Sequence, residues 1–396
     1  MSLISWEGWV GLLLGIAQSG GPGSLAIPDP DPIPIPGPVW LLKGLLVLTF
    51  LLHLVPMNLV LGGSVFAFLS HLRSRGSRPN AAHHRQLVER LAHVFPVAMA
   101  LTITTGIAPL LFLQVLYGQL FFSAAILMAW LWLSVLALML VGYYGFYWQA
   151  YGLEVLGPRA RWLAGVLAAT FLLIAFLFVN NMGMLQNPSL WKRLYLANPH
   201  GVHLYVLHDV SLIPRYLHFL LGALALFALL VAGIGIEARR RDQAFGKWAA
   251  TYGARWFVGV TFLQLFVGTW FLWSQPDRVR GAFLGGTQED TLLLIVAVAF
   301  ALGALMALAQ PRELATSRFW LGAGCITVTV TLMAIIRQRI RTGWLQPYFR
   351  TDTLQESSQW GAVILFSLML AIGLGITGWM LWQFHRKGPA QHSHRH

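Results

Sequence analysis

Long runs of apolar residues alternate along the chain with short polar connections, and this alternation predicts the fold. A run of about 20 apolar residues is long enough to cross the hydrocarbon core of a bilayer as an α-helix. The sequence therefore predicts an all-α, polytopic membrane helix bundle. It has about nine transmembrane helices, at residues 39–71, 92–116, 122–149, 162–183, 213–236, 252–275, 291–310, 318–338 and 360–384.

The two ends of the chain differ from these runs. Residues 4–17 are apolar but short, which favours a segment lying in the membrane interface. Residues 29–38 (DPDPIPIPGP) predict a stiff, extended approach to the first helix. We divide the chain into an N-terminal interfacial and Pro-rich segment (1–38), helices 1–5 (39–238), helices 6–9 (239–384) and a basic, His-containing tail (385–396).

Charge assigns the orientation. The chain is 57% hydrophobic and only 10% charged, and its net charge is +13. Basic residues gather in the connections after helices 1, 3, 5 and 7 and in the C-terminal tail, and such connections face the cytoplasm. We expect a multi-pass protein of the bacterial inner membrane with its N-terminus outside and its C-terminus cytoplasmic. The net positive charge then reflects the orientation of the chain in the membrane. Nucleic acid is excluded as a partner because no soluble domain is predicted.

Two histidines lie inside apolar helices. His53 interrupts the run LTFLLHLVPMNLVL (48–61), and His218 lies near the start of helix 5. The predicted orientation places both in the outer half of the membrane. An imidazole there has no water to solvate it, and a metal or haem iron is its commonest partner. The single Cys325 excludes a disulfide framework and any cysteine-based zinc or iron–sulfur site.

A third histidine, His208, lies in the predicted outer loop before helix 5. The loop could fold His208 back over the site of His218 as a further ligand. The alternative is an ordinary loop histidine held by hydrogen bonds. Most of the remaining histidines lie at the predicted inner surface or in the tail, where solvated or interfacial positions are expected.

Arginines concentrate at the outer end of helix 8, which is far from the positively charged inner surface. Arg337, Arg339 and Arg341 lie in the segment RQRIRTGW (337–344), and Arg215 precedes His218 by three residues. Haem propionates need cationic partners of this kind. A docking patch for a partner protein, or contact with lipid headgroups, is the other interpretation.

Acidic residues are placed differently. All fourteen map to loops, termini or predicted helix ends. A proton-coupled transporter usually carries a carboxylate inside the membrane, so this distribution argues against one. It also argues against carboxylate-ligated metal centres and paired-carboxylate hydrolysis, and no nucleophile, zinc-protease or phosphate-binding motif occurs.

Four segments, in order, carry a resemblance to a known family. LTFLLHLVPMNLVLGGSVFAFL (48–69), ALTITTGIAPLLF (100–112), VNNMGMLQNP (179–188) and PRYLHFLLGAL (214–224) resemble helices 1, 2, 4 and 5 of the large subunit of cytochrome bd-type quinol oxidases. The resemblance implies that His53 ligates a haem at the position of the oxygen-reducing site. It also implies that His218 ligates a low-spin haem b.

The chain departs from this family in three places. Helices 3 and 8 lack the glutamates of the oxygen site, so oxygen reduction is not expected. The methionine that completes the low-spin haem is missing from helix 7, and His208, Met182, Met184 or Met333 could replace it. The quinol-binding loop is shortened to about fifteen residues around 275–290, which weakens a quinone site at the family's position.

We therefore expect a divergent bd-like protein reduced to electron transfer. It would carry one or two b-type haems through His53 and His218, with Arg215, Arg337, Arg339 and Arg341 as candidate propionate partners. Quinone is a possible second cofactor, and a membrane subunit and a periplasmic cytochrome c-type protein are the expected partners. Two alternatives stay open: a subunit of a terminal oxygen or nitric oxide reductase, and a haem-free structural or transport subunit in which His53 bonds to a threonine or to Asn58.

Overall fold

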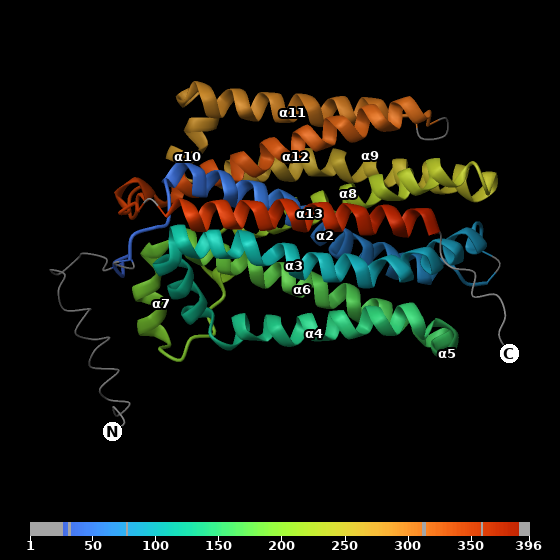
Figure 1. The fold of residues 1–396 in the computed structure, drawn as a ribbon, viewed down its shortest axis with the longest axis horizontal. Coiled ribbons are helices and arrows are strands. Elements are labelled where there is room, and N and C mark those ends of the chain that lie inside the picture. Colours follow the sequence, from blue (N-terminus) through green and yellow to red (C-terminus); the bar gives the residue numbers. More distant parts are fainter. Residues whose placement is uncertain (1–26, 31–32, 77, 311–313, 358, 388–396) are drawn as a thin grey trace.

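The fold is a bundle of long helices, in agreement with the prediction (Figure 1). The computed structural model describes residues 27–30, 33–76, 78–310, 314–357 and 359–387. The predicted interfacial segment at 4–17 and most of the C-terminal tail lie outside these residues. Within them, nine helices are long and apolar enough to cross a membrane. These are α2 (Val39–Arg73), α3 (Ala81–Met128), α4 (Trp130–Tyr151), α6 (Ala160–Gln186), α8 (Leu212–Ala238), α9 (Gln243–Trp273), α11 (Gln288–Leu308), α12 (Thr316–Leu345) and α13 (Trp360–Lys387).

Short elements connect the long helices at the two ends of the bundle. Only an isolated bridge between Ile35 and Glu356 resembles a sheet in the described part of the chain. Lipid offers no hydrogen-bond partners to the backbone, and a helix satisfies its backbone N–H and C=O groups internally. The connecting elements are α5 (Leu153–Leu156), α7 (Trp191–Ala197), α10 (Asp277–Gly281), the 3₁₀ turns η1 (Gly157–Arg159), η2 (Pro188–Leu190), η3 (Tyr205–Leu207) and η6 (Thr351–Thr353), and the π-helical turn η4 (Ala282–Gly286).

Helices adjacent in sequence pack as antiparallel pairs, and small residues allow their close approach. In the pair α8–α9, a Cβ on Gly235 would collide with the backbone of Ala250, and one on Gly253 with the backbone of Ala232. Lipid tails give helices no hydrophobic reason to associate, so close backbone contact of this kind holds membrane helices together. The pairs α2–α3 and α11–α12 are formed in the same way along the chain, and Figure 1 shows each pair running side by side.

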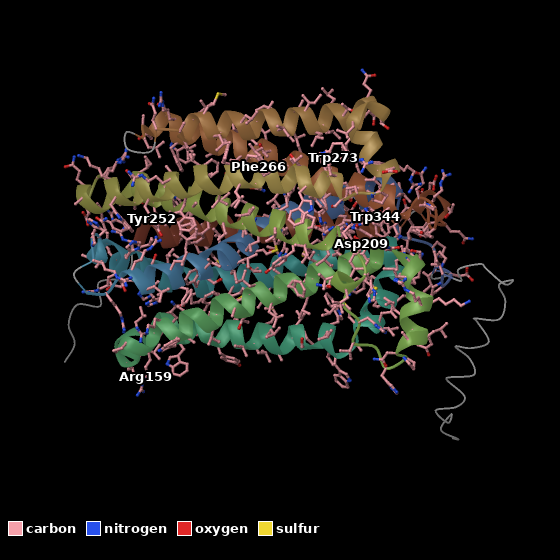
Figure 2. All side chains as sticks on the ribbon, turned by 180° about the vertical axis from the view of Figure 1, so that it is seen from behind. Arg159, Asp209, Tyr252, Phe266, Trp273 and Trp344 are labelled. Atoms are coloured by element: carbon pink, nitrogen blue, oxygen red, sulfur yellow. The ribbon has the colours of Figure 1, made fainter. Side chains whose placement is uncertain are left out.

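The two ends of the bundle are distinct. α2 and α8 begin at one end, which we call the outer end because the loop charges predict that it faces away from the cytoplasm. Asp209 and Trp344 lie toward the outer end, whereas Arg159 and Tyr252 lie toward the opposite, inner end (Figure 2). The orientation in the membrane and the division into helices 1–5 and 6–9 both stay predictions.

One helix boundary agrees with the prediction only in part. The sequence predicts a break between residues 116 and 122, and the helical backbone is interrupted there by a kink at Tyr117 (φ −140°, ψ 31°). A further helical stretch then continues to Met128, and the turn into α4 comes only at Ala129, which has a positive φ of 47°. Apolar residues continue on both sides of Tyr117, so hydropathy alone cannot place the turn. The kink matters for function because it positions Tyr117 beside α12.

Candidate haem site

His53 is half-buried in α2 and faces α3. Its Nδ1 atom lies 3.4 Å from Oγ1 of Thr105. The Thr105 hydroxyl already donates its proton to the carbonyl of Leu101 at 2.7 Å, so its oxygen is left to accept a proton from Nδ1. This contact assigns the N–H to Nδ1 and leaves the lone pair on Nε2. A neutral imidazole with a free Nε2 is the form that ligates metals.

The ring of His53 packs directly on a glycine of α3. A Cβ at Gly106 would lie 2.9 Å from Cε1, 3.1 Å from Nδ1 and 3.5 Å from Nε2 of His53; the first distance is shorter than Cβ contacts in proteins, and the second is as short as the tightest of them. The backbone carbonyl of Thr102, one turn before Gly106, also faces the imidazole. The side chain of His53 is therefore held against the α3 backbone on its Nδ1 side.

His218 repeats this arrangement in the pair α8–α9. A Cβ at Gly268 would lie 3.0 Å from Cε1 and 3.2 Å from Nδ1 of His218, and the carbonyl of Gln264, one turn earlier, faces the ring. The ring stacks on Phe271 with centroids 6.1 Å apart. Nδ1 is buried without a hydrogen-bond partner that meets normal geometry. Each histidine thus presents its Nδ1 edge to a glycine of the next helix.

The two histidines lie at similar depths. α2 and α8 run in the same direction, and a Cβ at Gly62 would collide with the carbonyl of Ala223, so these two residues are at one level. His53 precedes Gly62 by nine residues and His218 precedes Ala223 by five. The difference of four residues corresponds to about 6 Å along the helices. The two histidines therefore lie in one layer, and the placement of this layer in the outer half of the membrane stays a prediction.

Two of the predicted arginines line the same region from α12. Arg337 lies with its guanidinium 4.3 Å from the ring centroid of Phe50, three residues before His53. Arg341 is only 1% exposed, and its Nη1 donates to Oε1 of Gln338 at 2.8 Å. The amide of Gln338 in turn donates to the hydroxyl of Tyr117 at 2.8 Å. Burial of a cation such as Arg341 in an apolar bundle demands a compensating anion.

Arg215 completes a cluster of three. Its guanidinium lies 5.6 Å from the centroid of Phe271, the ring that stacks on His218. Its Nε and Nη2 atoms are buried without a hydrogen bond, as is Nε of Arg341. Arg215, Arg337 and Arg341 are close enough to repel one another. Among the described residues none of the three forms an ion pair.

An acidic group lies at the edge of this arginine cluster. Asp209 accepts the backbone N–H of Ser211 at 2.7 Å, just before α8 begins, and its charge acts on Arg215. Burial, and secondarily the negative charge of Asp209, raises the pKa of the Tyr205 phenol above its usual value. One carboxylate against three guanidinium groups leaves the arginine cluster with an excess of positive charge.

Two predicted site residues lie apart from this cluster. Arg339 is exposed and pairs with Glu289 at 2.8 Å and with Asp290 at 3.5 Å. His208 is exposed at the end of η3, where partial burial and the nearby Arg193 lower the pKa of its imidazole. Neither is brought against His53 or His218 by a described contact. Of the other proposed sixth ligands, Met184 is fully buried, whereas Met182 and Met333 are half-buried.

A cavity of about 610 Å³ opens at the outer end. The shortened loop contributes Val279 and Phe283 to its lining, and Lys43, Tyr117 and Phe349 face it from other elements. Tyr117 links the cavity through Gln338 to Arg341 by the two hydrogen bonds described above. The short loop thus still forms part of a pocket of the size that holds small organic molecules.

Haem fits these residues better than a bare metal ion does. The described residues contain no group of three or more His, Cys, Asp or Glu side chains able to hold a metal ion. Haem brings four nitrogen ligands of its own and needs one or two axial side chains. It also brings two propionates, which the unpaired nitrogens of Arg215 and Arg341 would satisfy. His53 and His218 are therefore suited to haem iron.

Several residues of this site escape sequence reasoning. Thr105, Gly106, Gly268 and Gln338 act through contacts between helices, and a single sequence does not reveal which helices pack together. A weak signal existed for the glycines, since each lies at a depth on the following helix that matches a buried histidine. An antiparallel pairing of neighbouring helices would have placed them opposite His53 and His218.

Comparison with known proteins supports the fold. No family model matches the chain, and no curated protein is similar to it. Among solved structures, the chain is similar to the bd oxidase from Geobacillus thermodenitrificans, with a TM-score of 0.66 and 14% sequence identity; the match covers 90% of this chain and 100% of that chain. At this identity the likeness shows the fold alone. The expectation of a bd-like fold is confirmed, whereas a place as a divergent member of the family stays a prediction.

Proposed function

We propose that this chain is a membrane haem b subunit of a respiratory complex. It transfers electrons between the quinone pool and a periplasmic cytochrome c-type carrier. The observation that carries the proposal is the pair His53 and His218, each held by its Nδ1 edge near a cluster of three arginines, one buried and two half-buried, that form no described ion pair. The likeness of the fold to that of a bd oxidase supports the same class of protein.

Each group of residues has a distinct task in this proposal. Bound haem b supplies reversible one-electron chemistry at its iron. His53 and His218 would each hold one haem through Nε2. Arg215, Arg337 and Arg341 would neutralise the propionates, and their positive charge would favour the reduced state. The surrounding apolar side chains exclude water, which limits the reorganisation that accompanies transfer of an electron.

The interior favours electron transfer over reduction of oxygen or nitric oxide. Those reductions consume protons, and proton delivery requires ionisable groups or water along the path. On the inner side of the histidine layer, Phe66, Phe95 and Phe227 are at most 1% exposed and form part of the packed core. A terminal reductase stays the alternative, and it would require a second subunit to supply acids or ligands.

The haem-free alternative has one observation in its favour. Thr105 occupies Nδ1 of His53, as that interpretation expects of a satisfied core histidine. Asn58, the other expected partner, is buried with its Oδ1 unbonded. The hydrogen bond to Thr105 does not account for the arginine cluster or for the matching environment of His218, so we favour haem.

The outer cavity is the candidate site for quinol. Its lining combines apolar side chains such as Phe283 and Phe349 with several charged ones. The apolar side chains suit a quinone ring, and the Tyr117 hydroxyl and the Lys43 ammonium are hydrogen-bond donors for quinone oxygens. The chain Tyr117–Gln338–Arg341 brings such a ligand into contact with the arginine cluster. Electrons would therefore enter next to the propionate partners.

The proposed partners follow from the position of the site. Both histidines lie toward the outer end, so a cytochrome c-type carrier would dock there, on the periplasmic face of the bacterial inner membrane. α13 exposes apolar residues along its length, among them Leu368, Ile372 and Trp379. Lipid or a partner membrane subunit would cover this helix.

Carbon monoxide distinguishes electron transfer from gas reduction. If both haems serve only electron transfer, each iron would need a second protein ligand besides His53 or His218, and the reduced spectrum would be unchanged when carbon monoxide is added. The measurement is a difference spectrum of the dithionite-reduced, purified protein with and without the gas. A carbon monoxide-induced shift of the Soret band would favour the terminal reductase instead.

A further inference from the structure

Gly106 and Gly268 occupy equivalent places in two helix pairs. In α2–α3 the histidine is on the first helix and Gly106 on the second, and in α8–α9 His218 and Gly268 are related in the same way. In both pairs the ring edge formed by Nδ1 and Cε1 touches the glycine. In both, the carbonyl that faces the ring belongs to the residue four positions before the glycine, Thr102 or Gln264.

Helix geometry explains why a glycine is needed there. The carbonyl of residue i−4 accepts the N–H of residue i but keeps a second lone pair. A side chain at residue i would stand between that lone pair and an approaching imidazole. With glycine, the ring comes within the 2.9–3.0 Å that a Cβ would otherwise occupy.

We propose that Gly106 and Gly268 are positioning residues for His53 and His218: each leaves a notch that admits the Nδ1–Cε1 edge of the ring beside a backbone carbonyl, so that Nδ1–H bonds this carbonyl when haem is held and Nε2 is fixed as the ligating atom. The inference rests on the proposed haem function and names the residues that orient the two histidine ligands. A hydrogen bond from the non-ligating nitrogen fixes the tautomer and orientation of a histidine ligand and increases its basicity. Thr105 strengthens the arrangement at His53 as a second acceptor.

The two sites would therefore hold haem through the same kind of ligand. Each helix pair supplies one imidazole, one glycine and one carbonyl, and no charged residue takes part. Since the acceptor is backbone, its identity does not depend on the side chain at position 102 or 264. The chain is thus built to bind two haems, one in each helix pair, by one structural principle.

Alanine substitutions test the notch. Gly106→Ala and Gly268→Ala place a methyl group 2.9 and 3.0 Å from Cε1 of the ring, so the ring must shift and Nδ1 moves away from the carbonyl. Loss of such a hydrogen bond weakens metal affinity by about 10- to 100-fold. We expect haem transfer from each variant to excess apomyoglobin to accelerate by that factor for one of the two haems. As long as the haem at the altered site is still bound, its midpoint potential should rise, because the imidazole becomes a weaker electron donor to the iron.

Matched controls separate the notch from a general loss of stability. Gly259→Ala lies on the same helix as Gly268, and Gly324→Ala lies on α12; neither added Cβ meets an atom within 4 Å. Alanine is the better helix former, so both controls should bind haem as the unmutated protein does. Gly118, the other glycine of α3, is unsuitable because it adjoins Tyr117.

The outcomes separate the two proposals. If Gly268→Ala and Gly106→Ala release haem no faster than the controls and keep its potential, the positioning role is wrong while haem binding stands. If one variant fails to fold, the other carries the test, since both are expected to behave alike. An unmutated protein that contains no haem overturns the proposed function and the positioning role together.

Discussion

Replacing His218 with alanine is expected to remove one haem from the protein and to leave the other in place. His53→Ala should do the same for the second haem, and the double variant should contain none. At that depth, His53 and His218 are the histidines of their helix pairs. The haem content should fall from about two per chain to about one in each single variant, measured by pyridine haemochrome against protein concentration.

His93→Ala serves as the control for both substitutions. His93 is an exposed histidine of α3, so its loss should change neither the haem content nor the spectrum. The absorption bands that disappear with His53 and with His218 should add up to the spectrum of the unmutated protein. If both single variants retain the full haem content, these histidines are not the ligands.

Replacing Arg341 with leucine is expected to act in opposite directions on the haem-free and haem-bound protein. Without haem, Arg341 adds to a cluster of three cations that repel one another, and its removal should stabilise the fold by about 1 kcal/mol or more. With haem, the same change removes a partner of a propionate. Haem should then be held more weakly, although the protein around it folds more firmly.

The loss of this charge should also lower the midpoint potential of the nearest haem. One unit charge at roughly 8 Å, with an effective dielectric constant of about 20, contributes about 2 kcal/mol, or roughly 90 mV for one electron. Arg339→Leu is the control, because Arg339 is exposed and paired with Glu289. Redox titration measures the midpoint potential, and thermal unfolding of the haem-free and haem-bound protein measures the two effects on stability. Equal effects of Arg341→Leu and Arg339→Leu would contradict a special role for the arginine cluster.

The helices could be predicted because each is an apolar run of membrane length, and lipid permits few other backbone structures. The turn between α3 and α4 could not, because residues on both sides of Tyr117 are apolar and the break at Ala129 depends on packing. The separation of Arg339 from Arg337 and Arg341 could have been predicted from the sequence. On a helix, positions four apart share a face, whereas the residue between them points away.

The histidines were predictable for a different reason from their surroundings. His53 and His218 stand out because a polar ring in an apolar run is costly without a partner. Gly106, Gly268 and Gln338 gain their roles from contacts across helix pairs, and nothing in their local sequence marks them. The placement of His208 depended on an outer loop whose course the sequence does not specify.

The most direct test of the account is the haem content of the purified, unmutated protein, determined by pyridine haemochrome together with any subunits that copurify. We expect b-type haem at about two per chain, with both haems reducible by a quinol analogue. A protein that is folded and pure but contains no haem would contradict the account.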